Sequence, residues 1–153
     1  MNKFKFEVKS GEVNLTDPCY NEKTWCGDYH VPALNGEWTV VVRESKARPG
    51  RPSGFTAYCR GHSKAHLVHD DTDYGVDSGQ FGIFDCEIYD GDSKYEEPGF
   101  YRNICDMTLE NSLGGVVSNQ GFASSTTWGD GSYRGKRAVN EKGELVKFSI
   151  SFS

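Results

Sequence analysis

Three turn-like segments place an aspartate beside glycine, proline or serine, residue types that let a loop approach a ligand closely. They are Asp17-Pro18-Cys19-Tyr20, Val76-Asp77-Ser78-Gly79-Gln80 and Gly129-Asp130-Gly131-Ser132-Tyr133. Aspartates in turns usually accept hydrogen bonds from nearby backbone amides, which is a structural role. If the three carboxylates converge instead, they can bind a ligand or a divalent cation. The candidate ligand-binding residues are therefore Asp17, Tyr20, Asp77, Gln80, Asp130 and Tyr133.

A second group of candidates is the histidine-rich stretch at residues 62–73. His62, His66 and His69 precede three aspartates, and histidine and carboxylate are both zinc ligands. On a strand, however, His66 and His69 would point to opposite faces, because their separation is odd. This stretch therefore favours a solvent-exposed polar hairpin, and we expect no metal site and no tightly bound zinc.

The cysteines offer a third chemistry, that of a thiolate nucleophile. Cys19 lies in a turn, and either His30 or His62 could act as its base, although no spacing fixes the pairing. The five cysteines are odd in number, form no CxxC pair and follow no apolar leader segment. We therefore expect five free thiols in a cytoplasmic protein.

Composition narrows the function classes. A net charge of −5 and an isoelectric point near 5.3 argue against a general affinity for nucleic acid. A mean hydropathy of −0.63 without a long apolar run predicts no transmembrane span, so no membrane partner is expected. The one basic run, residues 43–51, contains Pro49 and Gly50 and is typical of a mobile loop.

The elements that must position these residues are mostly strands. Apolar and polar residues alternate at 4–8, 38–42 and 146–152, which predicts strands with one wet face. Further strands are expected at 55–60 and 65–69, as a hairpin around 61–64, and at 80–89. Residues 136–139 and 145–152 form a second predicted hairpin, and residues 10–36 are expected to be rich in turns.

One helix is predicted, because apolar side chains between Gly99 and Glu110 recur at three-and-four spacing after Pro98. Together the patterns predict a mainly β fold, with residues 1–153 forming a single domain. We expect an antiparallel β-sandwich or barrel-like domain with one short helix packed on it.

The three motifs, in this order, resemble an uncharacterised family of bacterial and phage proteins described only as a domain of unknown function. Members of that family are similar in a DPCY turn, a VDSGQ segment and a GDGSY turn before a closing hairpin. The resemblance extends to residues 82–85 and to the helix through Cys105. It implies a cytoplasmic protein of a bacterium or phage and supplies no activity, cofactor or catalytic residue.

Two functions from different classes follow. The first is a non-catalytic binding protein that captures a small ligand or a host protein in a pocket of turn carboxylates and aromatic rings. The alternative is a hydrolase in which Asp17, Asp77 and Asp130 bind a metal or act as acid and base. We favour binding, because no motif combines a nucleophile, a base and an orienting group. No cofactor is expected, and whether the chain forms a homo-oligomer is left open.

Overall fold

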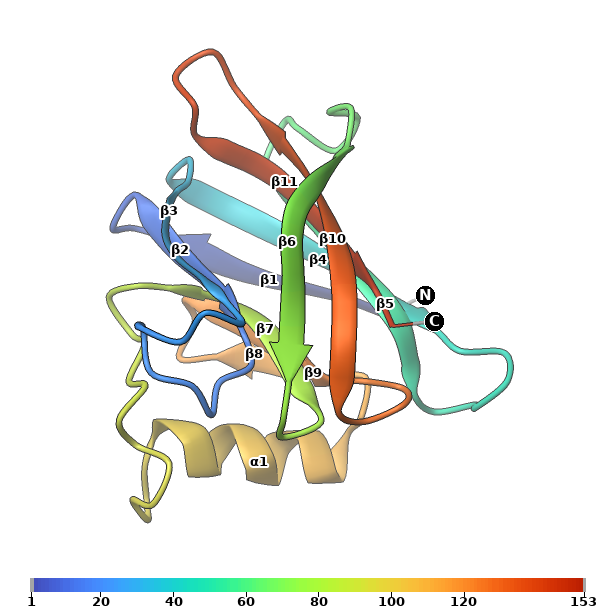
Figure 1. Ribbon diagram of the computed structural model, residues 1–153. Coiled ribbons are helices and arrows are strands. Elements are labelled where there is room, and N and C mark those ends of the chain that lie inside the picture. The colour runs from blue at the N-terminus through green and yellow to red at the C-terminus, as the bar shows by residue number, and fades with distance from the viewer. Residues whose placement is uncertain (1, 153) are drawn as a thin grey trace.

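The chain folds into two antiparallel sheets and one helix (Figure 1). The computed structural model describes residues 2–152. Strands contain 49% of the residues and the helix 7%, so the expected mainly β class is confirmed. The two sheets pack face to face as in a β-sandwich.

The larger sheet has six strands in the order β1-β4-β5-β11-β10-β6. Their bounds are β1 (Asn2–Val8), β4 (Gly36–Glu44), β5 (Pro52–Cys59), β11 (Leu145–Ser151), β10 (Gly131–Val139) and β6 (Val68–Val76). Alternate residues of β4, namely Trp38, Val40 and Val42, are buried, and the residues between them face outward. This period of two leaves the outer face of the sheet free for polar side chains.

The smaller sheet has five strands in the order β3-β2-β7-β9-β8. Their bounds are β3 (Asp28–Pro32), β2 (Glu12–Thr16), β7 (Gln80–Asp85), β9 (Gly121–Ser125) and β8 (Gly115–Val117). All six residues of β7 are buried. One face of this strand meets the larger sheet and the other lies toward the helix, so β7 shows no alternation.

The helix α1 (Phe100–Glu110) lies along the outer side of the smaller sheet (Figure 1). Its Ile104 packs with Phe84, Val117 and Ala123 in a small apolar cluster of its own. The predicted helix is therefore confirmed within one or two residues of its expected start. No helix within residues 2–152 is long and apolar enough to cross a membrane.

The core between the sheets is rich in aromatic rings. Phe55 of the larger sheet lies with its ring centroid 5.2 Å from Phe122 and 6.3 Å from Phe81, both on the smaller sheet. The same ring is 6.2 Å from Phe148 and 6.3 Å from Phe152. Phe55 thus joins the two sheets at their centre.

Two expectations about strands were wrong, and a third was incomplete. Residues 55–60 and 65–69 form no hairpin, because β5 pairs with β4 and β11 whereas β6 pairs with β10. Residues 10–36 are rich in turns at 17–27, as expected, but they also contain β2 and β3, whose buried residues do not alternate. The strand expected at 80–89 ends at Asp85, where the chain turns.

We predict that Phe55→Ala lowers the free energy of unfolding by about 3–5 kcal/mol, since it removes a buried ring that contacts both sheets. Chemical denaturation followed by fluorescence measures this. The control is Tyr95→Ala, which truncates an aromatic ring that is 93% exposed and should change stability by less than about 0.5 kcal/mol. Equal losses in the two variants would contradict the central position of Phe55.

Candidate functional site

The first two motifs meet at the carboxylate of Asp17, which is fully buried at the end of β2. Its Oδ2 accepts hydrogen bonds from the backbone amides of Asp77 and Ser78, each at 2.8 Å. Its Oδ1 accepts from the amide of Cys19 at 2.9 Å and from the Ser78 hydroxyl at 2.6 Å. Four donors therefore satisfy the two carboxylate oxygens. Three of them are backbone amides of turns, and their partial positive charges stabilise the carboxylate.

The third motif lies beside the second, because Gly131 of β10 pairs with Val76 of β6. The structure thus brings the three segments together at one end of the molecule. It does not give their carboxylates a common environment: Asp17 is buried, whereas Asp77 and Asp130 are exposed.

The other candidate residues of the motifs stabilise turns and packing. Gln80 is buried, and its Nε2 donates to the hydroxyl of Thr108 on α1 at 2.8 Å. The hydroxyl of Tyr133 donates to the carbonyl of Gly129 at 2.8 Å. Burial raises the pKa of the half-buried Tyr20, with a smaller contribution from the nearby Asp17 carboxylate. A role of these residues in ligand binding stays a prediction.

A groove of about 540 Å³ runs between α1 and the second motif. Gln80 lines it together with Gly129 of the third motif and with Arg51, Arg102 and Thr108. This groove is where two of the three motifs share a surface.

The cysteines are all free thiols in the structure, as expected. Burial, followed by the Asp17 carboxylate, raises the pKa of Cys19 far above its usual range. This thiol therefore stays protonated near neutral pH, which argues against a thiolate nucleophile at Cys19.

The histidine stretch does not form the strand on which the parity argument depended. β6 begins only at Val68, so His66 lies outside it, and the face that each side chain takes cannot be deduced from parity. Among the described side chains, the one group of three that could ligate a metal lies elsewhere and consists of Glu22, His30 and Cys86.

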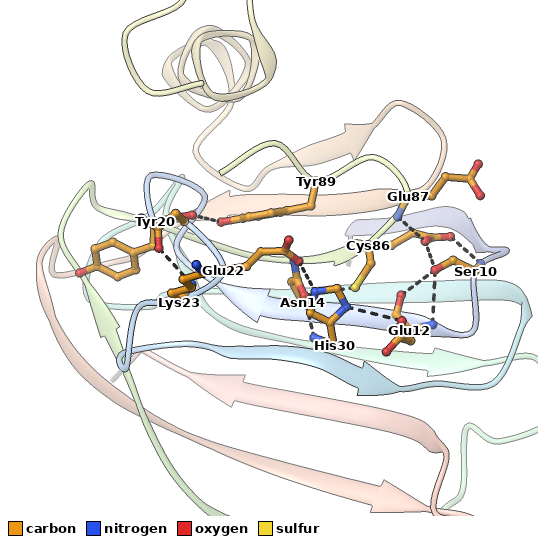
Figure 2. A network of polar contacts seen from close by, with 12 residues as sticks. Ser10, Glu12, Asn14, Tyr20, Glu22, Lys23, His30, Cys86, Glu87 and Tyr89 are labelled. Atoms are coloured by element: carbon orange, nitrogen blue, oxygen red, sulfur yellow. Dashed lines mark hydrogen bonds and ion pairs between the residues drawn. The ribbon is translucent and has the colours of Figure 1, made fainter. Parts of the chain in front are cut away.

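This cluster is assembled around β2 (Figure 2). Glu22 comes from the loop between β2 and β3, His30 from β3, and Cys86 from the residue after β7. The Nε2 of His30 lies 2.8 Å from the Oε2 of Glu22. Burial, and then Glu22 and Glu12, raise the pKa of Cys86 to about 12. No spacing in the sequence links positions 22, 30 and 86, and sequence reasoning therefore missed the group.

A different kind of site lies on the outer face of the larger sheet, where a pocket of about 380 Å³ is lined by basic side chains. Arg134 and Lys136 point there from β10, Arg43 comes from β4 and His69 from β6. Three serines, the ring of Tyr133 and the apolar Leu67 complete the lining, which includes no carboxylate among the described side chains. We call this concavity the basic pocket.

Arg43 reaches the basic pocket across Gly54, its pairing partner on β5. A Cβ at position 54 would lie 2.6 Å from the guanidinium of Arg43. Glycine at this position therefore leaves room for the Arg43 side chain to cross β5. The guanidinium donates to the Thr56 hydroxyl at 2.7 Å and to the Ile150 carbonyl at 3.0 Å. Burial lowers its pKa, and both hydrogen-bond acceptors are neutral.

The chain matches no protein-family model, no curated protein and no solved structure. The resemblance of the three motifs to an uncharacterised bacterial and phage family therefore stays a prediction.

We predict that Asp17→Asn lowers the free energy of unfolding by about 3 kcal/mol, because an amide cannot accept from all four donors and the charge is lost. Asp77→Asn is the matched control. Its exposed carboxylate makes no hydrogen bond to the turn, so the change should stay within about 0.5 kcal/mol. Denaturant titration of both variants checks this. A destabilisation by Asp77→Asn as large as that by Asp17→Asn would refute the stabilising role assigned to the Asp17 carboxylate.

Proposed function

We propose that the protein binds a small anionic ligand, one that carries phosphate or several carboxylate groups, in the basic pocket. The observation that carries this proposal is Arg43, a half-buried guanidinium in a concave lining that contains no carboxylate among the described side chains. Of the two functions considered from the sequence, this is the non-catalytic one, which the sequence favours. The position of the pocket on the sheet is different from the one that the sequence indicated.

The hydrogen bonds of Arg43 support an anionic ligand. A guanidinium has five N–H donors in a planar fork, which suits the oxygens of phosphate or carboxylate. Among the described side chains, no carboxylate forms an ion pair with Arg43. A bound anion would supply the opposite charge that this half-buried group lacks.

The surrounding charges support the same ligand class. Arg134 and Lys136 extend from neighbouring outward positions of β10, and His69 lies opposite Lys136 on β6. Arg134 forms an ion pair with Asp73, its Nε lying 3.0 Å from Oδ1, but both of these side chains are largely exposed. In a chain of net charge −5, this concentration of positive charge is a local feature and would attract a small anion.

The serine hydroxyls would complete the recognition of such a ligand. Ser149 lies opposite Lys136 on β11, and Ser132 comes from the third motif together with Tyr133. Hydroxyl groups donate to phosphate oxygens as arginine and lysine do. The third motif therefore contributes to the proposed site through Ser132 and Tyr133, and not through the carboxylate of Asp130.

The hydrolase alternative receives less support. A metal held by Asp17, Asp77 and Asp130 would compete for carboxylate lone pairs that already accept four hydrogen bonds at Asp17. A cytoplasmic setting in a bacterium or phage stays a prediction from the resemblance.

The test is isothermal titration of the protein with pyrophosphate at low ionic strength. We predict a single site with a Kd of about 1 mM or tighter, weakening as salt is added. The double variant Arg134→Gln/Lys136→Gln should weaken binding about tenfold or more, because each charge-assisted hydrogen bond contributes about 1.5–3 kcal/mol.

The matched control is Arg102→Gln/Lys142→Gln, which removes the same two charges on α1 and in the β10–β11 turn. It should change the Kd less than about twofold, since neither side chain lines the basic pocket. An equal loss in both double variants would show a bulk charge effect and refute the site. The absence of any binding to the unaltered protein would refute the proposed function.

A further inference from the structure

We propose that Glu22, His30 and Cys86 form a Zn²⁺ site with three protein ligands and a fourth position for water. This inference is independent of the basic pocket, which lies on the other sheet. It rests on the ligand set, on the side chains that hold the ligands, and on the backbone conformation of His30.

The three ligands offer one oxygen, one nitrogen and one sulfur atom, all within 4.8 Å of one another. This mixed set suits zinc, which binds carboxylate, imidazole and thiolate and prefers four ligands. Ligand atoms around a tetrahedral zinc ion lie about 3.3–3.8 Å apart, given bond lengths of about 2.0–2.3 Å. One present spacing lies below that range, since Nε2 of His30 and Oε2 of Glu22 are 2.8 Å apart, and no pair is separated by more than 4.8 Å. Small side-chain rotations would bring the three atoms to tetrahedral distances.

One buried side chain contacts all three ligand residues in the metal-free protein. Asn14 is fully buried, and its Nδ2 donates to the Oε2 of Glu22 at 2.9 Å. Its Oδ1 accepts from the backbone amide of His30 at 2.9 Å and, in the metal-free protein, from the thiol of Cys86 at 3.2 Å. Zinc binding would release the thiol proton to solvent, so in the loaded site Asn14 would hold Glu22 and the backbone of His30. Figure 2 shows the three ligands gathered around this amide. Such outer hydrogen bonds typically orient metal ligands and are part of the site.

The imidazole also has the orientation that a metal ligand requires. Its Nδ1 lies 3.5 Å from the Oε1 of Glu12, while its Nε2 faces Glu22. A carboxylate behind one ring nitrogen directs the other nitrogen toward a metal. The side chain of His30 is 52% exposed, so solvent reaches the cluster and water can occupy the fourth position.

The backbone of His30 gives independent support. Val13 pairs with Val31 and Leu15 pairs with Asp28, so two residues of β3, Tyr29 and His30, lie opposite the single residue Asn14. At this bulge His30 has φ of 54°, a left-handed conformation that glycine adopts without strain. The fold therefore tolerates a strained histidine where glycine would suffice, which is typical of functional positions.

The expectation of no tightly bound zinc came from a different set of histidines. It used the parity of His66 and His69, neither of which belongs to this cluster. The hydrolase considered from the sequence used other carboxylates as well. The present site thus shares no residue with either hypothesis.

The test is titration of the metal-free protein with Co²⁺ and Zn²⁺, the cobalt ion serving as a spectroscopic probe. We expect one Co²⁺ per chain, a near-ultraviolet thiolate-to-cobalt band and visible bands of tetrahedral intensity. Zn²⁺ should displace the cobalt at one equivalent. A hundredfold excess of Zn²⁺ over its Kd should raise the melting temperature by about 5–10 °C.

Three variants locate the ligands. Cys86→Ser should abolish the near-ultraviolet band, and Glu22→Gln should weaken cobalt binding at least tenfold. His30→Gly should lose the zinc-induced rise in melting temperature, while the metal-free variant still folds, because glycine takes the left-handed conformation freely. Cys105→Ser and Glu87→Gln are the controls and should bind metal as the unaltered protein does.

Each of the following results would refute the proposed zinc site. A thiolate band that persists in Cys86→Ser, or that disappears equally in Cys105→Ser, would overturn the assignment. So would a cobalt spectrum without a thiolate band in the unaltered protein, or a zinc-induced stabilisation that His30→Gly retains. If Glu22→Gln binds cobalt unchanged, Glu22 is no ligand and the proposed three-ligand site is refuted.

Discussion

Aromatic packing between the two sheets is the constraint on which the rest of the structure depends. Phe55, Phe81, Phe122 and Phe148 meet at the centre, and burial of such rings contributes most of the free energy that holds the layers together. Because the inner faces are committed to apolar side chains, polar chemistry is confined to outer faces, edges and ends. Accordingly, the basic pocket lies on an outer face, and His30 of the proposed zinc site lies on the edge strand β3.

Two buried carboxylates then fasten the loops to this core. Asp17 joins the first two motifs, and Asp85 accepts hydrogen bonds from the amides of Lys9, Ser10 and Glu87. Burial alone would raise the pKa of Asp85, but hydrogen bonds from the Ser10 hydroxyl, from the amides of Glu87 and Lys9 and from Gln120 outweigh burial and lower it. A carboxyl group with a lowered pKa stabilises the folded state at neutral pH. That contribution is lost as acid takes the pH through the lowered pKa.

The sequence correctly predicted the elements that have one face in solvent and one in the core, because such elements show a regular pattern of apolar and polar residues. The alternation at 38–42 and 146–152 and the periodicity of α1 were sufficient, because each element is half exposed. β2 and β7 are covered on both faces, so alternation was absent and their limits were missed or misplaced. Pairing partners and both proposed sites depend on contacts between distant segments, and His30 depends on a bulge. Composition and spacing carry none of that information.

The position of β11 has a consequence for how the chain reaches this fold. This strand, the last in the sequence, lies inside the larger sheet between β5 and β10. Phe55 therefore finds its partner Ile150 only across most of the chain length. Closing so long a loop costs entropy before any pairing is gained, and such topologies fold slowly. During synthesis one edge of β5 stays unpaired until β11 has emerged, and an unpaired strand edge can pair with other chains.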